Sequence, residues 1–187
     1  MKSNKIMQFS RLFIAAMALF LVVSCNKGQS LQEYYVDNKE DDDFVMVDVP
    51  TSLISPESNM LDEDQKEVLA TVKKINIMAY PIKNGDMTKY KTETEKVKKI
   101  LSSDDYEELM SFGNGGQRMR LYFKGEEDAI DEVIVYVQDA EKGFLLARVL
   151  GDDMNITSLS SLVKSFQNGE ANVDISQFEG IMDVFGQ

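Results

Sequence analysis

The sequence of 187 residues contains no histidine, no tryptophan and a single cysteine. Without histidine, neither a Ser-His-Asp triad nor a Cys-His pair can be assembled for nucleophilic catalysis. Zinc and copper sites also lose their usual nitrogen and sulfur ligands. The side chains that remain for catalysis are carboxylates, lysine, tyrosine and serine, and we expect neither a metal nor a cofactor.

The amino-terminal end has the composition of a secretory signal. From Met1 to Ser24 the chain carries three basic residues and no acid. The apolar run Leu12–Val23 is 12 residues long, which is shorter than the ~20 residues that a membrane-spanning helix needs. The run ends in Val22-Val23-Ser24-Cys25, which resembles a bacterial lipobox. That resemblance implies removal of residues 1–24 as a lipoprotein signal peptide and lipidation of Cys25; the alternative is an ordinary signal peptide that ends near a cysteine.

The charge of the chain restricts the class of partner. Lys and Arg total 20 and Asp and Glu total 32, and loss of the signal peptide would change the net charge from −12 to −15 because it removes three bases. Phosphate-rich partners are repelled by so acidic a surface, so we expect no nucleic-acid ligand. An anionic membrane surface is repelled as well, which leaves the lipid on Cys25 as the membrane attachment. Because that lipid uses the single cysteine, the core must be held by packing without disulfides.

Residues 25–43 are polar and end in the acidic run Glu40–Asp43. Like charges in a row repel one another and stay solvated, so we predict a flexible acidic tether here. Calcium binding by the run is the alternative, since calcium takes six to eight oxygen ligands, but no EF-hand-like loop frames it. Some surface-exposed lipoproteins of the Bacteroidota carry an acidic export signal directly after the cysteine. Asn26-Lys27-Gly28 stands at that place here, which favours an anchor that faces the periplasm.

Hydrophobic periodicity predicts the elements of one domain over residues 44–168. Met119 and Leu121 alternate with charged or polar residues, which indicates a half-buried strand, and Val97 and Ile100 recur at helical spacing. We predict strands over 44–49, 75–80, 106–112, 118–124, 133–137 and 144–150, and helices over 56–74, 87–103 and 155–168.

The resulting order, β-α-β-α-β-β-β-β-α, predicts an α+β fold. Consecutive strands joined by short links pair antiparallel, so we expect an antiparallel-rich sheet with the helices packed on one face. The lysine-rich outer side of the helix over 87–103 is expected to be solvated, with recruitment of an acidic partner as the alternative.

Residues 169–187 form a C-terminal amphipathic tail in this prediction. Asp174 can cap a helix with one apolar stripe. So short a helix does not persist alone in water, so we expect the stripe to dock on its own domain or on a partner protein. The candidate contact residues are Ile175, Phe178, Ile181, Met182 and Phe185.

Several stretches of the domain resemble the Bacteroidota lipoproteins of domain-of-unknown-function family 4252, over about residues 44–166. The family has no established activity, so the resemblance implies a location and a fold and supplies no catalytic residues. Its members are often encoded near extracytoplasmic-function sigma factors, which implies a role in envelope stress or signalling. The matching stretches are Tyr106–Met110, the glycine turn that ends at Gly116, Arg118–Lys124, Val133–Val137 and the segment from Phe144 to Ile156.

Three short patterns bear on enzymatic activity. Ser161-Leu162-Val163-Lys164 matches the S-x-x-K pattern of penicillin-binding proteins, but K-T-G is absent and Ser161 lies in the middle of a predicted helix. The acid-rich stretches Glu126–Asp128 and Gly151–Asp153 have the residue types for glycoside hydrolysis, yet they equally fit a turn and a helix start. Gly113–Gly116 is predicted to be a turn, since the phosphate-loop pattern is incomplete.

Taken together, the sequence predicts a non-enzymatic binding module of the cell envelope. We expect it to be anchored by the lipid on Cys25, at the outer membrane and facing the periplasm, with an envelope protein as its partner. The alternative is a periplasmic hydrolase that uses carboxylate or serine-lysine chemistry. A deep pocket with converging acids would favour the hydrolase, and a flat or grooved apolar surface would favour the binding module.

Overall fold

The computed structural model describes residues 28–49, 63–82, 86–155 and 157. The chain divides into two units, residues 1–30 and 31–187, and all of the described helices and strands belong to the second. The signal peptide, the helix start at 56–62 and the tail at 169–187 lie outside the described residues. In chain order the elements are α2 (Leu31–Asp37), β1 (Val45–Val49), α3 (Glu63–Thr71), β2 (Val72–Pro81), α4 (Met87–Leu101), β3 (Glu107–Asn114), β4 (Gln117–Glu126), β5 (Ala129–Asp139) and β6 (Gly143–Met154).

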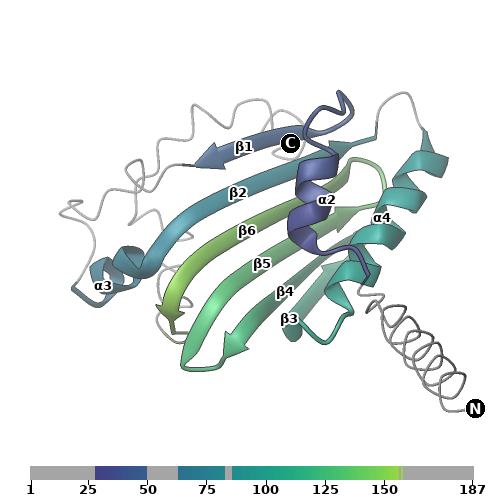
Figure 1. Cartoon of the computed structure of the whole chain (residues 1–187). Helices are drawn as coiled ribbons and strands as arrows, with labels where there is room; N and C mark the ends of the chain where they lie inside the picture. The colour runs from purple at the N-terminus through teal and green to yellow at the C-terminus, as the bar shows by residue number, and fades with distance from the viewer. Residues whose placement is uncertain (1–27, 50–62, 83–85, 156, 158–187) are drawn as a thin grey trace, which may run out of the picture. The chain divides into compact units, whose positions relative to one another are not determined.

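The six strands form one antiparallel sheet in the order β1-β2-β6-β5-β4-β3 (Figure 1). Strands β3 to β6 follow one another through short turns, and each pairs with the next. All six predicted strands are present, so the predicted α+β fold with an antiparallel sheet is confirmed.

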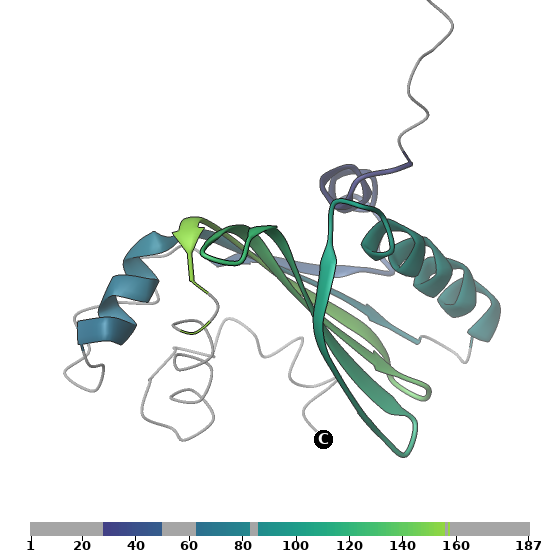
Figure 2. The same cartoon turned by 90° about the horizontal axis from the view of Figure 1, so that it is seen from below.

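Helices α2 and α4 lie on the same face of the sheet, which we call the first face (Figure 2). Helix α4 begins where predicted because the carboxylate of Asp86 accepts hydrogen bonds from the backbone N–H groups of Thr88 (3.1 Å) and Lys89 (3.0 Å). Its buried side includes Val97 and Ile100. Helix α3 lies apart from α2 and α4 and contacts β2 and β6.

Aromatic side chains dominate the core between the sheet and the helices on the first face. The ring of Phe44 meets that of Tyr80 edge to face at 5.2 Å, and Tyr80 stacks on Phe144 at 5.4 Å. Tyr34 and Tyr136 complete this group and are fully buried. Large rings bury much apolar surface per residue, so this cluster gives the small domain a core held by packing.

The prediction of a flexible tether over residues 25–43 is wrong for the part from Leu31 onward. Residues 31–37 form helix α2, and Leu31 and Tyr34 are buried against the sheet. Leu31, Tyr34 and Tyr35 stand at positions i, i+3 and i+4, which places them on one side of a helix. Tertiary packing of that side stabilises a helix too short to form alone.

The boundary between α3 and β2 also differs from the prediction. The sequence placed Val72, Lys73 and Lys74 at the end of a helix, whereas β2 already begins at Val72 and pairs there with Gly151 of β6. Lysines at the end of a helix interact favourably with its dipole, but this effect is small. Backbone hydrogen bonds between β2 and β6 outweigh it here.

The predicted helix over 155–168 is described only at its start. The side chain of Asn155 accepts a hydrogen bond of 2.9 Å from the backbone N–H of Thr157, which is helical. Asn155 is therefore an N-cap, at the predicted start of this helix. The rest of that helix lies outside the described residues. Among the described helices, none is long and apolar enough to cross a membrane.

Candidate functional site

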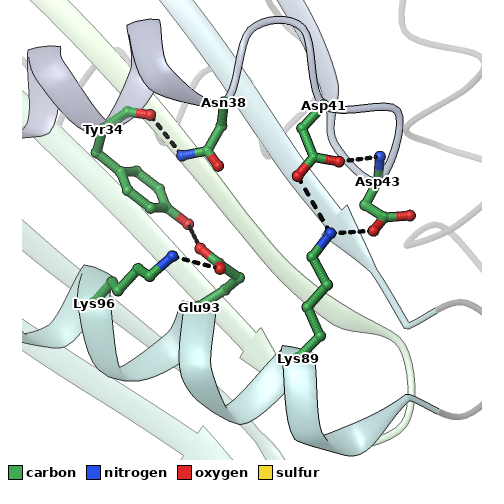
Figure 3. A network of polar contacts seen from close by, with 7 residues as sticks. All are labelled: Tyr34, Asn38, Asp41, Asp43, Lys89, Glu93 and Lys96. Carbon is green, nitrogen blue, oxygen red and sulfur yellow. Dashed lines mark hydrogen bonds and ion pairs between the residues drawn. The ribbon is translucent and has the colours of Figure 1, made fainter.

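A buried tyrosine–carboxylate contact joins α2 to α4 (Figure 3). The hydroxyl of Tyr34 donates a hydrogen bond of 2.9 Å to Glu93 Oε2, and Lys96 Nζ donates one of 2.7 Å to Glu93 Oε1. Burial, and then the neighbouring Glu93 charge, hold the pKa of Tyr34 far above its ordinary value. The Tyr34 hydroxyl is therefore neutral at physiological pH and acts as a hydrogen-bond donor. Both carboxylate oxygens of Glu93 accept a hydrogen bond, so we interpret the contact as one that holds α2 against α4.

The acidic run contacts the start of α4 (Figure 3). Lys89 Nζ lies 3.2 Å from Asp41 Oδ2 and also contacts Asp43 Oδ2. The hydrogen bond to Asp43 is the main cause that raises the pKa of Lys89 above its ordinary value. The cation held by these two aspartates is thus the ammonium group of Lys89, and Asp41 and Asp43 are only partly exposed.

A second polar group is buried between α2 and the sheet. Arg148 Nε donates a hydrogen bond of 2.5 Å to Glu132 Oε1, and Arg148 Nη1 donates to the side chain of Gln32 in α2. The hydroxyl of Tyr106 reaches Glu132 Oε1 at 3.3 Å. Burial is the first cause of the raised pKa of Tyr106, and Glu132 is the second. Since each buried charge has a partner, this group fixes α2 and the start of β3 to the sheet.

The structure places both acid-rich stretches at the ends of strands. Glu126, Glu127 and Asp128 are exposed at the β4–β5 turn, and together with Glu107 they line an open hollow of about 520 Å³. Gly151–Asp153 belong to the end of β6 and not to a helix start, and Asp152 pairs with Lys73. Ser161 and Lys164 lie outside the described residues. Within the described residues, no group of three histidine, cysteine or acidic side chains is arranged to hold a metal ion.

The glycine turn connects β3 to β4, as predicted. Gly115 (φ 60°) and Gly116 (φ 112°) adopt the left-handed conformations that glycine tolerates. A strand follows the turn, whereas a phosphate loop leads into the N-terminus of a helix. On the first face, an open hollow of about 410 Å³ lies beside the turn and contains one charged side chain, Arg118, with Tyr90 and Gln138. The titratable side chains of this lining are Tyr90 and Arg118.

The middle of the other side of the sheet, which we call the second face, is almost wholly apolar. Residues directly opposite in an antiparallel sheet point to the same side, so the strand registers define three rows across all six strands. Only Glu107 among these positions is polar. From β3 to β1 the rows are Phe112-Met119-Val137-Leu145-Ala79-Val45, Met110-Leu121-Val135-Ala147-Ile77-Val47 and Glu107-Phe123-Val133-Val149-Ile75-Val49.

Exposure on the second face is greatest at its β3–β4 side. Phe112 is 58% exposed, and Met110 and Met119 are each 39% exposed; we call these three residues the edge patch. The sequence predicts a strand over 106–112, which contains Met110 and Phe112, and a half-buried strand with Met119, but no contact role for these residues. Alternation of apolar and polar residues along the strands predicts that one side of the sheet is apolar. It does not predict which residues on that side are exposed to solvent.

Fold and surface define a small α+β domain with helices on one sheet face and an apolar second face. The family model described as "Domain of unknown function (DUF4252)" matches residues 34–162. This chain therefore belongs to that family, and the match begins inside α2, in agreement with its place in the core. No curated protein and no solved structure matches the chain.

Proposed function

We propose that this protein is a lipid-anchored, non-enzymatic binding module of the cell envelope. It faces the periplasm from the outer membrane, attached through Cys25, and it binds an envelope protein at the edge patch. The exposure of Phe112 and Met110 on the outermost strand β3, and of Met119 on the neighbouring strand β4, carries the proposal. The basic start and lipobox support the anchor. A role in envelope signalling rests on the family resemblance alone.

The edge patch has the chemistry of a contact surface for an extended peptide. Large contiguous apolar groups on a protein surface mark interaction sites. Strand β3 is at the end of the sheet, and no strand in the described part of the chain pairs with its outer side. A partner segment can add to such an edge through backbone hydrogen bonds while its apolar side chains contact Phe112.

The hydrolase alternative gains no support from the described residues. The carboxylates of Glu126–Asp128 are exposed at a turn, and that of Glu132 is held in an ion pair with Arg148. The hollow beside the glycine turn offers Arg118 with neutral groups. We therefore retain the binding module as the one proposed function.

The test compares two variants with equally exposed apolar side chains. Phe112→Ser alters the edge patch, and Val36→Ser alters an apolar residue of α2 that is also 58% exposed. The intact lipoprotein and both variants are captured from chemically cross-linked envelopes, and co-purified proteins are quantified by isotope labelling. Burying a large apolar side chain contributes about 1.5–3 kcal/mol, so we expect Phe112→Ser to lower the yield of a specific partner about tenfold or more. Equal yields from the two variants would contradict the proposal.

A further inference from the structure

The second face lacks a covering layer in the described part of the chain. A buried cluster on this side consists of Val72, Phe123, Ile130, Val133 and Met154, and every one of them belongs to a strand. The helices on the first face contribute only to the aromatic core. A sheet face this apolar is stable in water when another layer packs on it.

The chain leaves the sheet on this side. Met154, the last residue of β6, is fully buried in the cluster with Phe123 and Val133 of the third row. The next residue, Asn155, caps a helical start at Thr157. A helix thus begins next to the third row of the second face.

We propose that residues 155–187 fold back over the second face as two amphipathic helices, which close a helix–sheet–helix arrangement. The occupant is this chain's own C-terminal segment. Its apolar residues recur at helical spacing in two groups. They are Ile156, Leu159, Leu162, Val163 and Phe166 in the first group, and Ile175, Phe178, Ile181, Met182 and Phe185 in the second.

The dimensions of the segment fit the face. A helix rises about 1.5 Å per residue, so each group spans about 16 Å. Five residues of a strand, the extent of the three rows, also span about 16 Å. Two helices packed 8–10 Å apart cover about 20 Å, whereas six strands spaced about 4.8 Å span about 24 Å between the outermost axes. Two helices therefore leave one edge of the face uncovered, in agreement with the exposure of Phe112.

Covalent continuity favours this occupant over a second copy or another protein. A segment joined to the sheet through Asn155 acts at an effective concentration in the millimolar range. A separate molecule reaches the face only at its own, lower concentration. The second apolar group begins only nine residues after the first ends, at Ile175 after Phe166, so the same segment supplies both groups.

The direct test places a photoreactive benzoylphenylalanine at position 178 of the full-length lipidated protein, purified in detergent. The matched control carries it at Ser176, on the opposite side of the same predicted helix. We expect irradiation at position 178 to give cross-links within one chain, mapped by mass spectrometry to peptides of β5 or β6. The yield should exceed that of position 176 several-fold. Cross-linked dimers, cross-links to another protein or to α2 and α4, or equal yields from both positions would overturn the proposal.

A second measurement shortens the chain at Asn168. We expect the shortened protein to stay folded and to melt several degrees lower, because the first helix remains and the second apolar stripe is lost. An unchanged melting temperature would overturn docking of the second helix. Failure to fold would overturn the expectation that the sheet and the first helix form a stable core without the second helix. Circular dichroism distinguishes the three results.

Discussion

The hydroxyl of Tyr34 donates a 2.9 Å hydrogen bond to the carboxylate of Glu93, which is 59 residues further along the chain. This contact, between two buried side chains, fixes α2 onto α4. The domain therefore begins at Leu31 and not after a long tether.

Loss of the Tyr34 hydroxyl is expected to destabilise the fold. Tyr34→Phe leaves the buried Glu93 without one donor, which should lower the free energy of unfolding by about 1.5–3 kcal/mol. The control is Tyr35→Phe, which removes a 3.1 Å hydrogen bond to the neutral carbonyl of Ile77 and should cost about 0.5–1.5 kcal/mol. Urea unfolding followed by circular dichroism measures both losses. A smaller loss for Tyr34→Phe than for Tyr35→Phe would contradict the role of the contact.

Stability is expected to fall at alkaline pH. Burial raises the pKa of Tyr35 to about 12 and that of Tyr34 further, whereas a tyrosine in the unfolded chain titrates near 10. Above about pH 10, tyrosines of the unfolded chain therefore lose their protons while those of the folded protein keep them. The free energy of unfolding then declines with rising pH, by about 1.4 kcal/mol per pH unit for a fully buried tyrosine. Urea midpoints at pH 8, 10 and 11, with tyrosinate absorbance as a parallel signal, measure this decline. A constant midpoint from pH 8 to 11 would refute it.

The Arg148–Glu132 pair is expected to show strong coupling. Arg148→Met leaves the carboxylate of Glu132 buried without its cation, which should cost about 3–5 kcal/mol. Replacing both residues, with Glu132→Leu as the second change, removes the unpaired charge and should cost less than either single variant. A double-mutant cycle from urea unfolding gives the coupling energy. Additive losses would show that the pair is not energetically linked.

Lipidation of Cys25 is expected from the lipobox. Cells supplied with a labelled fatty acid should label the protein, and Cys25→Ser should abolish the label and release the protein from the membrane fraction. Label that persists in the serine variant would contradict acylation at this residue. The protein with Cys25 unchanged, produced in the same cells, serves as the reference.

The strands were predictable because each is either an alternation of apolar and polar residues or a short apolar run. The β3–β6 meander follows directly from such runs and from short turns such as Gly115-Gly116. Helix α4 was predictable from its periodic apolar side. Local sequence and tertiary contacts agree in these elements, so sequence patterns were sufficient.

Helix α2 and the edge patch depend on contacts that sequence periodicity does not contain. Only Leu31, Tyr34 and Tyr35 mark the buried side of α2, among polar neighbours, and their partners are far along the chain. The spacing of these three residues was the available signal. Phe112 lies in an apolar alternation like that of any buried strand, and its exposure follows from the position of β3 at the sheet edge.

The most direct measurement of the proposed binding function is site-specific photo-cross-linking in living cells. Benzoylphenylalanine is placed at position 112 of the lipidated protein, and at position 36 as the control with the same exposure. The account predicts one dominant cross-linked envelope protein from position 112, which is absent from position 36 and lost when Met110 and Met119 are both changed to serine. No cross-link from position 112, or the same products from both positions, would contradict it.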